Sequence, residues 1–236
     1  MAPHRGRRGD LQYVRAQATP HSARLRPGRR RDMFPPVASD PGRTIVFLDL
    51  TRFTALTDAH GDDAAAQVVD RFVDAVTAAV LGRGRLVKTL GDGVLLEARG
   101  PAAAIEVADH VSHQLHYADR MPEVTAGIAT GTVVDRGEDV LGAVVNLAAR
   151  LSDLAPPGEL RVTEHAARAA ADAGWQVEPL GTTEIRGFHD PVAVFRVLLC
   201  HPEDCVTDPV CGMRITPGAG TPASTVAGGS ISFCSA

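Results

Sequence analysis

Segments between residues 44 and 130 alternate strand-like and helix-like patterns in the order βαββαβ. Residues 44–50 (TIVFLDL) form a continuous apolar run with one acid, which is typical of a buried strand. Two later apolar runs flank Gly91-Asp92-Gly93, a signal for a hairpin turn. The predicted elements are strand 44–50, helix 64–81, strands 85–90 and 94–97, helix 102–116 and strand 124–130.

Further elements follow this core. We expect a turn at 135–138, a helix over 142–154, a break at residues 156–158 and an alanine-rich helix over 164–173. Short strands before and after that last helix close the domain near residue 198. The order predicts an α+β fold, with a ferredoxin-like βαββαβ core and additional C-terminal helices and strands.

This topology places two acids at one end of the sheet. The first strand of such a core lies antiparallel beside the third, so the hairpin before the third strand sits where the first strand ends. Asp49 and Asp92 are therefore expected to meet. An aspartate in a buried strand is costly unless it is paired or binds a cation, and paired carboxylates suit a hard cation. We expect Mg²⁺ or Mn²⁺ with a phosphate ligand, although Asp92 alone could be a common turn aspartate.

Composition excludes several classes of protein. The chain has 236 residues, is 44% hydrophobic and carries a net charge of −4, without the basic excess of a nucleic-acid-binding protein. No apolar run approaches the roughly 20 residues that cross a bilayer. All four cysteines lie in the last 37 residues, so the main body has no disulfide framework. We expect a cytoplasmic protein with no membrane partner and no specific nucleic-acid partner.

The two ends of the chain differ from the main body. Residues 1–43 hold ten arginines against three aspartates among proline, glycine and serine, and are predicted to be a disordered leader. Residues 44–198 form the main domain, and 199–206 a linker. Within the main domain, Lys88 is the only lysine among 24 basic side chains, and Asn146 is the only asparagine of the chain.

Three segments resemble the signature motifs of class III nucleotidyl cyclases, the adenylate/guanylate cyclase homology domain. FLDLTRFT at 47–54, VKTLGDG at 87–93 and DVLGAVVNLAAR at 139–150 are similar to the family patterns F-x-D-[ILV]-x-G-F-T, K-x-[IL]-G-D and D-x-x-G-x-x-V-N-x-A-x-R. The resemblance covers about residues 44–198, and three ordered motifs are far more specific than one short pattern. It implies the class III cyclase fold, which agrees with the element order.

The resemblance also implies a role for each matching residue. Asp49 and Asp92 match the aspartates that hold two divalent ions, and Lys88 with Asp139 matches the pair that reads the purine edge. The other matches contact ribose or phosphate: Asn146 orients the ribose, Arg150 stabilises charge on the transferred phosphoryl group, and Arg186, in EIRGF, lies near a basic phosphate contact. The only lysine and the only asparagine thus fall on functional positions.

These residue types suit a cyclisation in which the ribose 3′-oxygen attacks the α-phosphate and pyrophosphate leaves. Two metal ions can activate the nucleophile and neutralise the phosphates, and the rest of the work is positioning. Asn146 and Arg150 are four residues apart and share one face of a helix. Lys88 can donate to adenine N1 while Asp139 accepts from the exocyclic amine, and guanine would need the reverse pair. We therefore expect an adenylate cyclase that uses ATP.

In this family each active site lies between two domains, one with the metal aspartates and one with the purine pair, asparagine and arginine. This chain holds both sets, so the resemblance implies a homodimer. One position departs from the pattern, because Arg52 stands where the family usually has glycine. Arg52 could add a phosphate contact, or it could crowd the loop. The alternative is a degenerate cyclase-homology domain that binds nucleotide or a partner without turnover.

Residues 207–236 resemble a truncated YHS module, a small cysteine-containing domain linked to metal binding. DPVCGM at 208–213 and ISFCS at 231–235 carry the resemblance, but the later cysteine and helix of the module are missing. About 30 residues without a metal or cross-link are too few to fold alone. Cys211 and Cys234 could ligate a soft metal, although two thiolates leave a zinc site half empty. A metal-handling protein is the third and weakest interpretation.

Overall fold

The computed structural model describes residues 42–118, 120–198, 206–215, 221–226 and 229–234. The leader predicted for 1–43 and the linker predicted for 199–206 lie almost entirely outside these residues. None of the described helices is long and apolar enough to cross a membrane.

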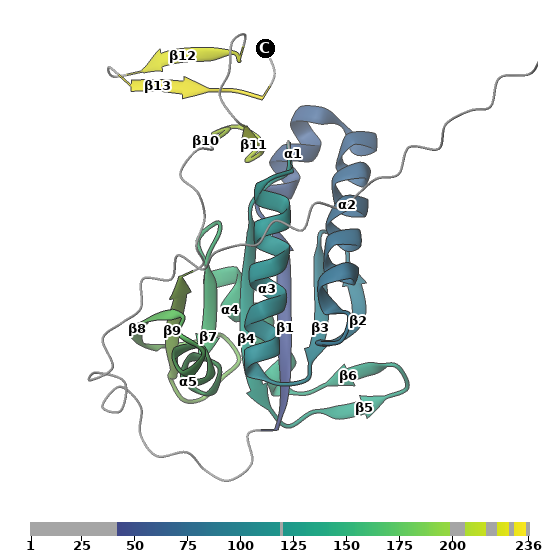
Figure 1. Ribbon diagram of the computed structural model, residues 1–236, viewed down its shortest axis with the longest axis vertical. Coiled ribbons are helices and arrows are strands. Elements are labelled where there is room, and N and C mark those ends of the chain that lie inside the picture. Colours follow the sequence, from purple (N-terminus) through teal and green to yellow (C-terminus); the bar gives the residue numbers. More distant parts are fainter. Residues whose placement is uncertain (1–41, 119, 199–205, 216–220, 227–228, 235–236) are drawn as a thin grey trace, which may run out of the picture.

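A seven-stranded mixed sheet forms the centre of the molecule (Figure 1), with strands in the order β2-β3-β1-β4-β7-β9-β8. Its strands are β1 (Arg43–Leu50), β2 (Gly84–Leu90), β3 (Gly93–Ala98), β4 (Val124–Gly131), β7 (Leu160–Thr163), β8 (Gln176–Thr183) and β9 (Val192–Leu198). The helices are α1 (Phe53–His60), α2 (Asp62–Val80), α3 (Pro101–His116), α4 (Ala143–Leu154) and α5 (Glu164–Ala173).

The predicted α+β core is confirmed by the strand pairing. β1 lies between β3 and β4 and is antiparallel to both, as a ferredoxin-like arrangement requires. β7 then pairs parallel with β4, and β9 and β8 extend the sheet antiparallel. These are the additional C-terminal strands that the sequence predicts.

Two elements differ from the sequence prediction. The structure has a helix, α1, directly after β1, where we predicted none. Only Leu56 of its eight residues is buried, so the segment has little apolar periodicity. The turn predicted at 135–138 is a complete hairpin of β5 (Val134–Arg136) and β6 (Asp139–Leu141). Its strands have three residues each, too few to give an alternating pattern.

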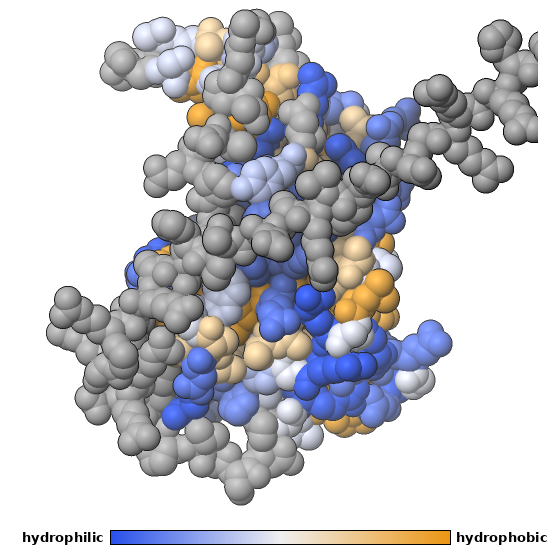
Figure 2. Space-filling view, in the orientation of Figure 1, coloured by the Kyte–Doolittle hydropathy of each residue, from blue (hydrophilic) through white to orange (hydrophobic). Residues whose placement is uncertain are grey.

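The two faces of the sheet are covered differently. α2, α3 and α5 cover one face through a large apolar cluster that includes Val46, Phe72, Ile105 and Ala170. The outer surface of α2 and α3 is mostly hydrophilic (Figure 2), as expected for amphipathic helices. The other face carries a smaller cluster around Ile45, Leu95 and α4.

The C-terminal segment packs against the main body at one end of the sheet (Figure 1). It contains two short hairpins, β10 (Val206–Thr207) with β11 (Arg214–Ile215), and β12 (Ala223–Val226) with β13 (Gly229–Ser232). Met213 bridges to Pro122, and the Arg214 amide donates to the Met121 carbonyl. Cys211 and Met213 join the large apolar cluster, so this segment shares the core of the main body.

Candidate functional site

Asp49 and Asp92 lie at the same end of the sheet. Asp49 is opposite Gly93 on β3 and opposite Thr125 on β4. The amide of Leu50 donates to the carbonyl of Asp92 at 3.2 Å, which closes the end of β1 onto the hairpin. The topology thus brings the two candidate metal ligands together.

The environment of Asp49 disfavours its negative charge. Burial, together with the smaller effects of the charges of Asp92 and Asp153, raises the pKa of Asp49 to about 6. A divalent cation between these carboxylates would offset both effects, because it replaces the lost hydration and the repulsion with attraction. The structure therefore adds Asp153, at the end of α4, to the acids near this point.

Gly93 leaves the room that the Asp49 carboxylate occupies. A Cβ at position 93 would lie 2.7 Å from Asp49 Oδ1 and 3.0 Å from the Phe47 ring. Any side chain there would displace the carboxylate. Gly93 is thus needed for the space beside Asp49 as well as for the hairpin turn.

Lys88 and Asp139 form the second candidate pair. Lys88 Nζ donates to Asp139 Oδ2 at 2.8 Å, and the Val140 amide donates to Asp139 Oδ1 at 2.8 Å. The hydrogen bond from Lys88, and to a smaller extent the one from the Val140 amide, holds the pKa of Asp139 below its usual value. A single site therefore presents one cationic donor beside one anionic acceptor.

A β-bulge sets the direction of Lys88. The register between β2 and β3 shifts between Leu86 and Lys88, so that Lys88 pairs with Leu95. Leu95 belongs to the cluster on the α4 face, and directly paired residues share a face. Without the extra residue, Lys88 would face the opposite side.

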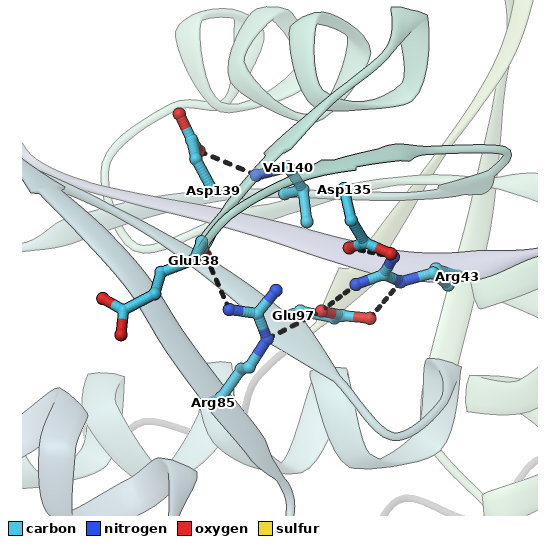
Figure 3. Close-up of polar contacts among 7 residues, drawn as sticks. All are labelled: Arg43, Arg85, Glu97, Asp135, Glu138, Asp139 and Val140. Atoms are coloured by element: carbon cyan, nitrogen blue, oxygen red, sulfur yellow. Dashed lines mark hydrogen bonds and ion pairs between the residues drawn. The ribbon is translucent and has the colours of Figure 1, made fainter.

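A network of charges holds the β5–β6 hairpin that carries Asp139 (Figure 3). Glu97 accepts hydrogen bonds from both Arg43 and Arg85. Arg43 also donates to Asp135 at 2.6 Å, and Arg85 donates to the Glu138 carbonyl at 2.8 Å. The hydrogen bond from Arg43 is the main cause that lowers the pKa of Glu97. By holding the hairpin, this network positions Asp139, and no local sequence pattern indicates it.

Asn146 and Arg150 lie on α4 and are both exposed. Arg150 donates to Asp153 at 2.9 Å, one turn further along the helix. The helix approaches β4 closely at Gly127, where an added Cβ would lie 1.9 Å from the Ala148 carbonyl oxygen. Gly127 thus allows α4 to pack directly on the strand and fixes the position of both candidates.

The remaining candidate, Arg186, lies apart. It is exposed in the turn between β8 and β9, next to a turn bond from the Phe188 amide to the Ile185 carbonyl. Among the described residues, no hydrogen bond or ion pair joins Arg186 to the other candidates. Nor does one join the Asp49–Asp92 pair to the Lys88–Asp139 pair. The described candidate residues of one chain are therefore not joined into a single bonded network.

Arg52 has a left-handed backbone conformation, with φ 55° and ψ 30°. Glycine adopts this conformation at lower cost, which gives a physical reason for the glycine usual at this position. The Arg52 guanidinium donates to the Pro209 carbonyl, and its aliphatic part lies against Gly212. The Arg52 side chain thus contacts the C-terminal segment, and no local sequence pattern indicates this contact.

Comparison with known proteins identifies the family. The fold is that of a mixed α/β nucleotidyl cyclase, and residues 39–198 match the family described as "Adenylate and Guanylate cyclase catalytic domain". The chain belongs to this family.

Curated relatives include an adenylate cyclase of Glutamicibacter nicotianae, 35% identical over 151 residues, which are 63% of this chain and 37% of that protein. An adenylate cyclase of Streptomyces coelicolor is 42% identical over 111 residues, 47% of this chain and 29% of that protein. The chain thus spans only about a third of the length of these relatives.

A solved structure shows the same fold. The adenylyl cyclase CyaB from P. aeruginosa matches with a TM-score of 0.59 at 21% identity, over 67% of this chain and 94% of that one. At this identity, the likeness concerns the fold alone.

Proposed function

We propose that this chain is an adenylate cyclase that converts ATP into 3′,5′-cyclic AMP and pyrophosphate. The observation that carries the proposal is the Lys88–Asp139 pair, with its donor and acceptor 2.8 Å apart. Adenine offers an acceptor at N1 beside the donor amine, so the pair can transfer its hydrogen bonds to the base. The curated relatives named above, both adenylate cyclases, support the same choice.

Asp49 and Asp92 are proposed to hold two ions of Mg²⁺ or Mn²⁺. Carboxylates are the ligands that these hard cations prefer, and the raised pKa of Asp49 marks a place where a cation is favourable. Bound ions would neutralise the triphosphate and lower the pKa of the ribose 3′-hydroxyl. Asn146 and Arg150 would orient the ribose and stabilise charge on the α-phosphate, with Arg186 as a further phosphate contact.

The active form is proposed to be a homodimer in which each site combines residues of both chains. Among the described residues, no hydrogen bond or ion pair joins the Asp49–Asp92 pair to the Lys88–Asp139 pair, which agrees with this arrangement. Two exposed leucines, each two positions from a candidate residue in the sequence, also support it: Leu90 before Asp92 and Leu141 after Asp139. Contact between two copies would bury these leucines next to the reacting groups.

The test is cyclic nucleotide production by the full chain with Mn²⁺ and either ATP or GTP. We expect cyclic AMP from ATP, and a loss of about 100-fold or more in Asp92→Ala. Asp63→Ala removes an exposed acid on α2 and should retain full activity. Preference for GTP would contradict the assignment of the base.

Mixing variants tests the shared sites. Asp49→Ala and Arg150→Ala remove different halves of each site, so a mixed dimer keeps one intact site. Equal mixing should restore roughly a quarter of the wild-type rate, because half of the dimers are mixed and each has one working site. Asp49→Ala mixed with Asp92→Ala removes the same half and should restore nothing. Activity that never returns in the first mixture would contradict the shared site.

One observation favours the alternative, a domain that binds nucleotide without turnover. Arg52 occupies a glycine-type conformation beside Asp49 and is held by the C-terminal segment. In that case a folded dimer would bind ATP and yield no product. Arg52→Gly would then be expected to restore turnover.

A further inference from the structure

Three side chains from distant parts of the chain meet where the C-terminal segment lies on α1. His60 is the last residue of α1, and Cys211 and Cys234 belong to the C-terminal segment. The Cys211 and Cys234 sulfurs are 3.4 Å apart, and Cys234 Sγ is 3.4 Å from His60 Nε2. All three atoms lie within 4.8 Å of one another. The cluster is thus compact enough to share one ion.

Two of the three separations are close to those between metal ligands. A disulfide needs sulfurs about 2.05 Å apart, and neither cysteine is in one. Bond lengths of about 2.3 Å to sulfur and 2.0 Å to nitrogen place tetrahedral zinc ligands about 3.5–3.8 Å from each other. The two 3.4 Å separations at Cys234 therefore need change by only a few tenths of an ångström, and Cys211 Sγ lies within 4.8 Å of the His60 ring nitrogen.

Asp208 builds the framework that brings the two cysteines together. Its buried carboxylate accepts the amides of Val210 at 2.7 Å and Cys211 at 3.3 Å on one oxygen, and of Cys234 at 2.8 Å on the other. The carboxylate thus holds the backbone at Cys211 and the backbone at Cys234 on one group, which sets the two sulfurs beside each other.

The third ligand comes from the main body because the segment is docked there. Arg52 donates to the Pro209 carbonyl, and Arg214 makes an ion pair with Glu123 at 3.4 Å. Cys211, only 1% exposed, lies in the apolar cluster that it shares with α2 and α3. The two thiolates that the sequence offers thus gain a histidine that no local motif indicates.

We propose that His60, Cys211 and Cys234 bind one Zn²⁺ ion, with a water molecule as the fourth ligand. Thiolate and imidazole ligands select soft or borderline cations, whereas the Asp49–Asp92 site suits hard ones. Binding releases the two thiol protons to solvent, and no electron is transferred. The ion joins the C-terminal segment to the helix that begins directly after the loop of Asp49. This binding proposal stands apart from the cyclase activity.

The test uses the full chain, reduced and freed of metal by a chelator. Titration with Co²⁺ should give a thiolate-to-metal charge-transfer band, which ions bound only by carboxylates lack. Zn²⁺ should displace Co²⁺ at one equivalent per chain. Asp49→Ala should keep the band, because it alters only the other metal site.

Variants identify the ligands. His60→Ala, Cys211→Ser and Cys234→Ser should each weaken Zn²⁺ binding by about 100-fold or more, since even outer-shell partners contribute 10–100-fold. His60→Cys replaces one soft ligand with another and should restore binding, which a structural role for His60 would not allow. His189→Ala, at an exposed histidine, and the double variant Cys200→Ser/Cys205→Ser should bind as the wild type does.

Two results would overturn the proposal. One is the absence of the charge-transfer band in the reduced wild-type chain. The other is Zn²⁺ binding that survives in both His60→Ala and Cys211→Ser, or that is lost in Cys200→Ser/Cys205→Ser.

Discussion

The two faces of the central sheet differ in how much apolar side chain they bury and in which candidate residues they carry. The face under α2, α3 and α5 is closed by a large apolar cluster and carries none of the residues proposed for nucleotide cyclisation. The face under α4 has a smaller cluster with half-buried members such as Phe47, and it carries Lys88 and Asp49. A closed face cannot admit a substrate, and an open face contributes less apolar burial to folding. The fold thus concentrates its apolar core on one face of the sheet, and the residues proposed to bind substrate lie on the other.

Two phenylalanines test this comparison most strongly. Phe72, on α2, is fully buried, whereas Phe47, on β1, is half-buried on the α4 face. Phe72→Ala should lower the free energy of unfolding by about 4 kcal/mol, and Phe47→Ala by about half as much. Denaturant unfolding measures both. Equal losses would mean that the two faces are packed equally well.

Gly127→Ala should lower the free energy of unfolding by about 3 kcal/mol, because the new methyl group would push α4 away from β4. Denaturant unfolding measures this loss as well. Gly100→Ala is the matched control, since a Cβ there meets nothing within 4 Å, and it should leave the free energy of unfolding nearly unchanged. A mild effect at position 127 would show that α4 is held loosely.

Asp49→Asn should stabilise the metal-free protein by about 1–2 kcal/mol at pH 7.5, after allowance for the partial exposure of the carboxyl. The folded pKa is raised from 3.8 to about 6, so the wild type loses stability as pH rises through that window. Unfolding in chelator at pH 4 and pH 7.5 measures the difference.

The gain from Asp49→Asn should fall to a small fraction at pH 4, because the folded carboxyl is protonated there and the pH is close to the unfolded pKa of 3.8. Glu97→Gln provides a control of opposite sign. The pKa of Glu97 is lowered, so its loss should destabilise the protein at neutral pH. A destabilised Asp49→Asn at pH 7.5 would contradict the account of this site.

The smallest effect is expected for Asp153→Asn, which breaks an exposed ion pair with Arg150. The free energy of unfolding should change by less than about 0.5 kcal/mol. The charge of Asp153 raises the pKa of Asp49, so the stability transition of Asp49 should move to lower pH. If the stability transition of Asp49 stays at the same pH, the charge of Asp153 does not affect the pKa of Asp49.

The strand order was predictable because hydrophobic period, turn residues and the rules of βαβ connection are local or nearly local signals. They were enough to bring Asp49 to Asp92, since Asp92 lies in the turn that the topology puts there. α1 was missed because only one of its eight residues is buried, and the β5–β6 hairpin because its strands are too short to show a period. The roles assigned to Asn146, Arg150 and Arg186 remain predictions.

By itself, the sequence determined the core topology, the family motifs and the pairing of acids at a strand end. Only the tertiary structure decided that Arg52 contacts Pro209, that Asp153 lies near Asp49, and that His60 meets Cys211 and Cys234. His60 and Cys234 are separated by 174 positions, and no periodicity or turn signal relates residues so far apart. Their contact follows from the packing of a short helix and a small C-terminal segment at one end of the sheet, which depends on the whole core.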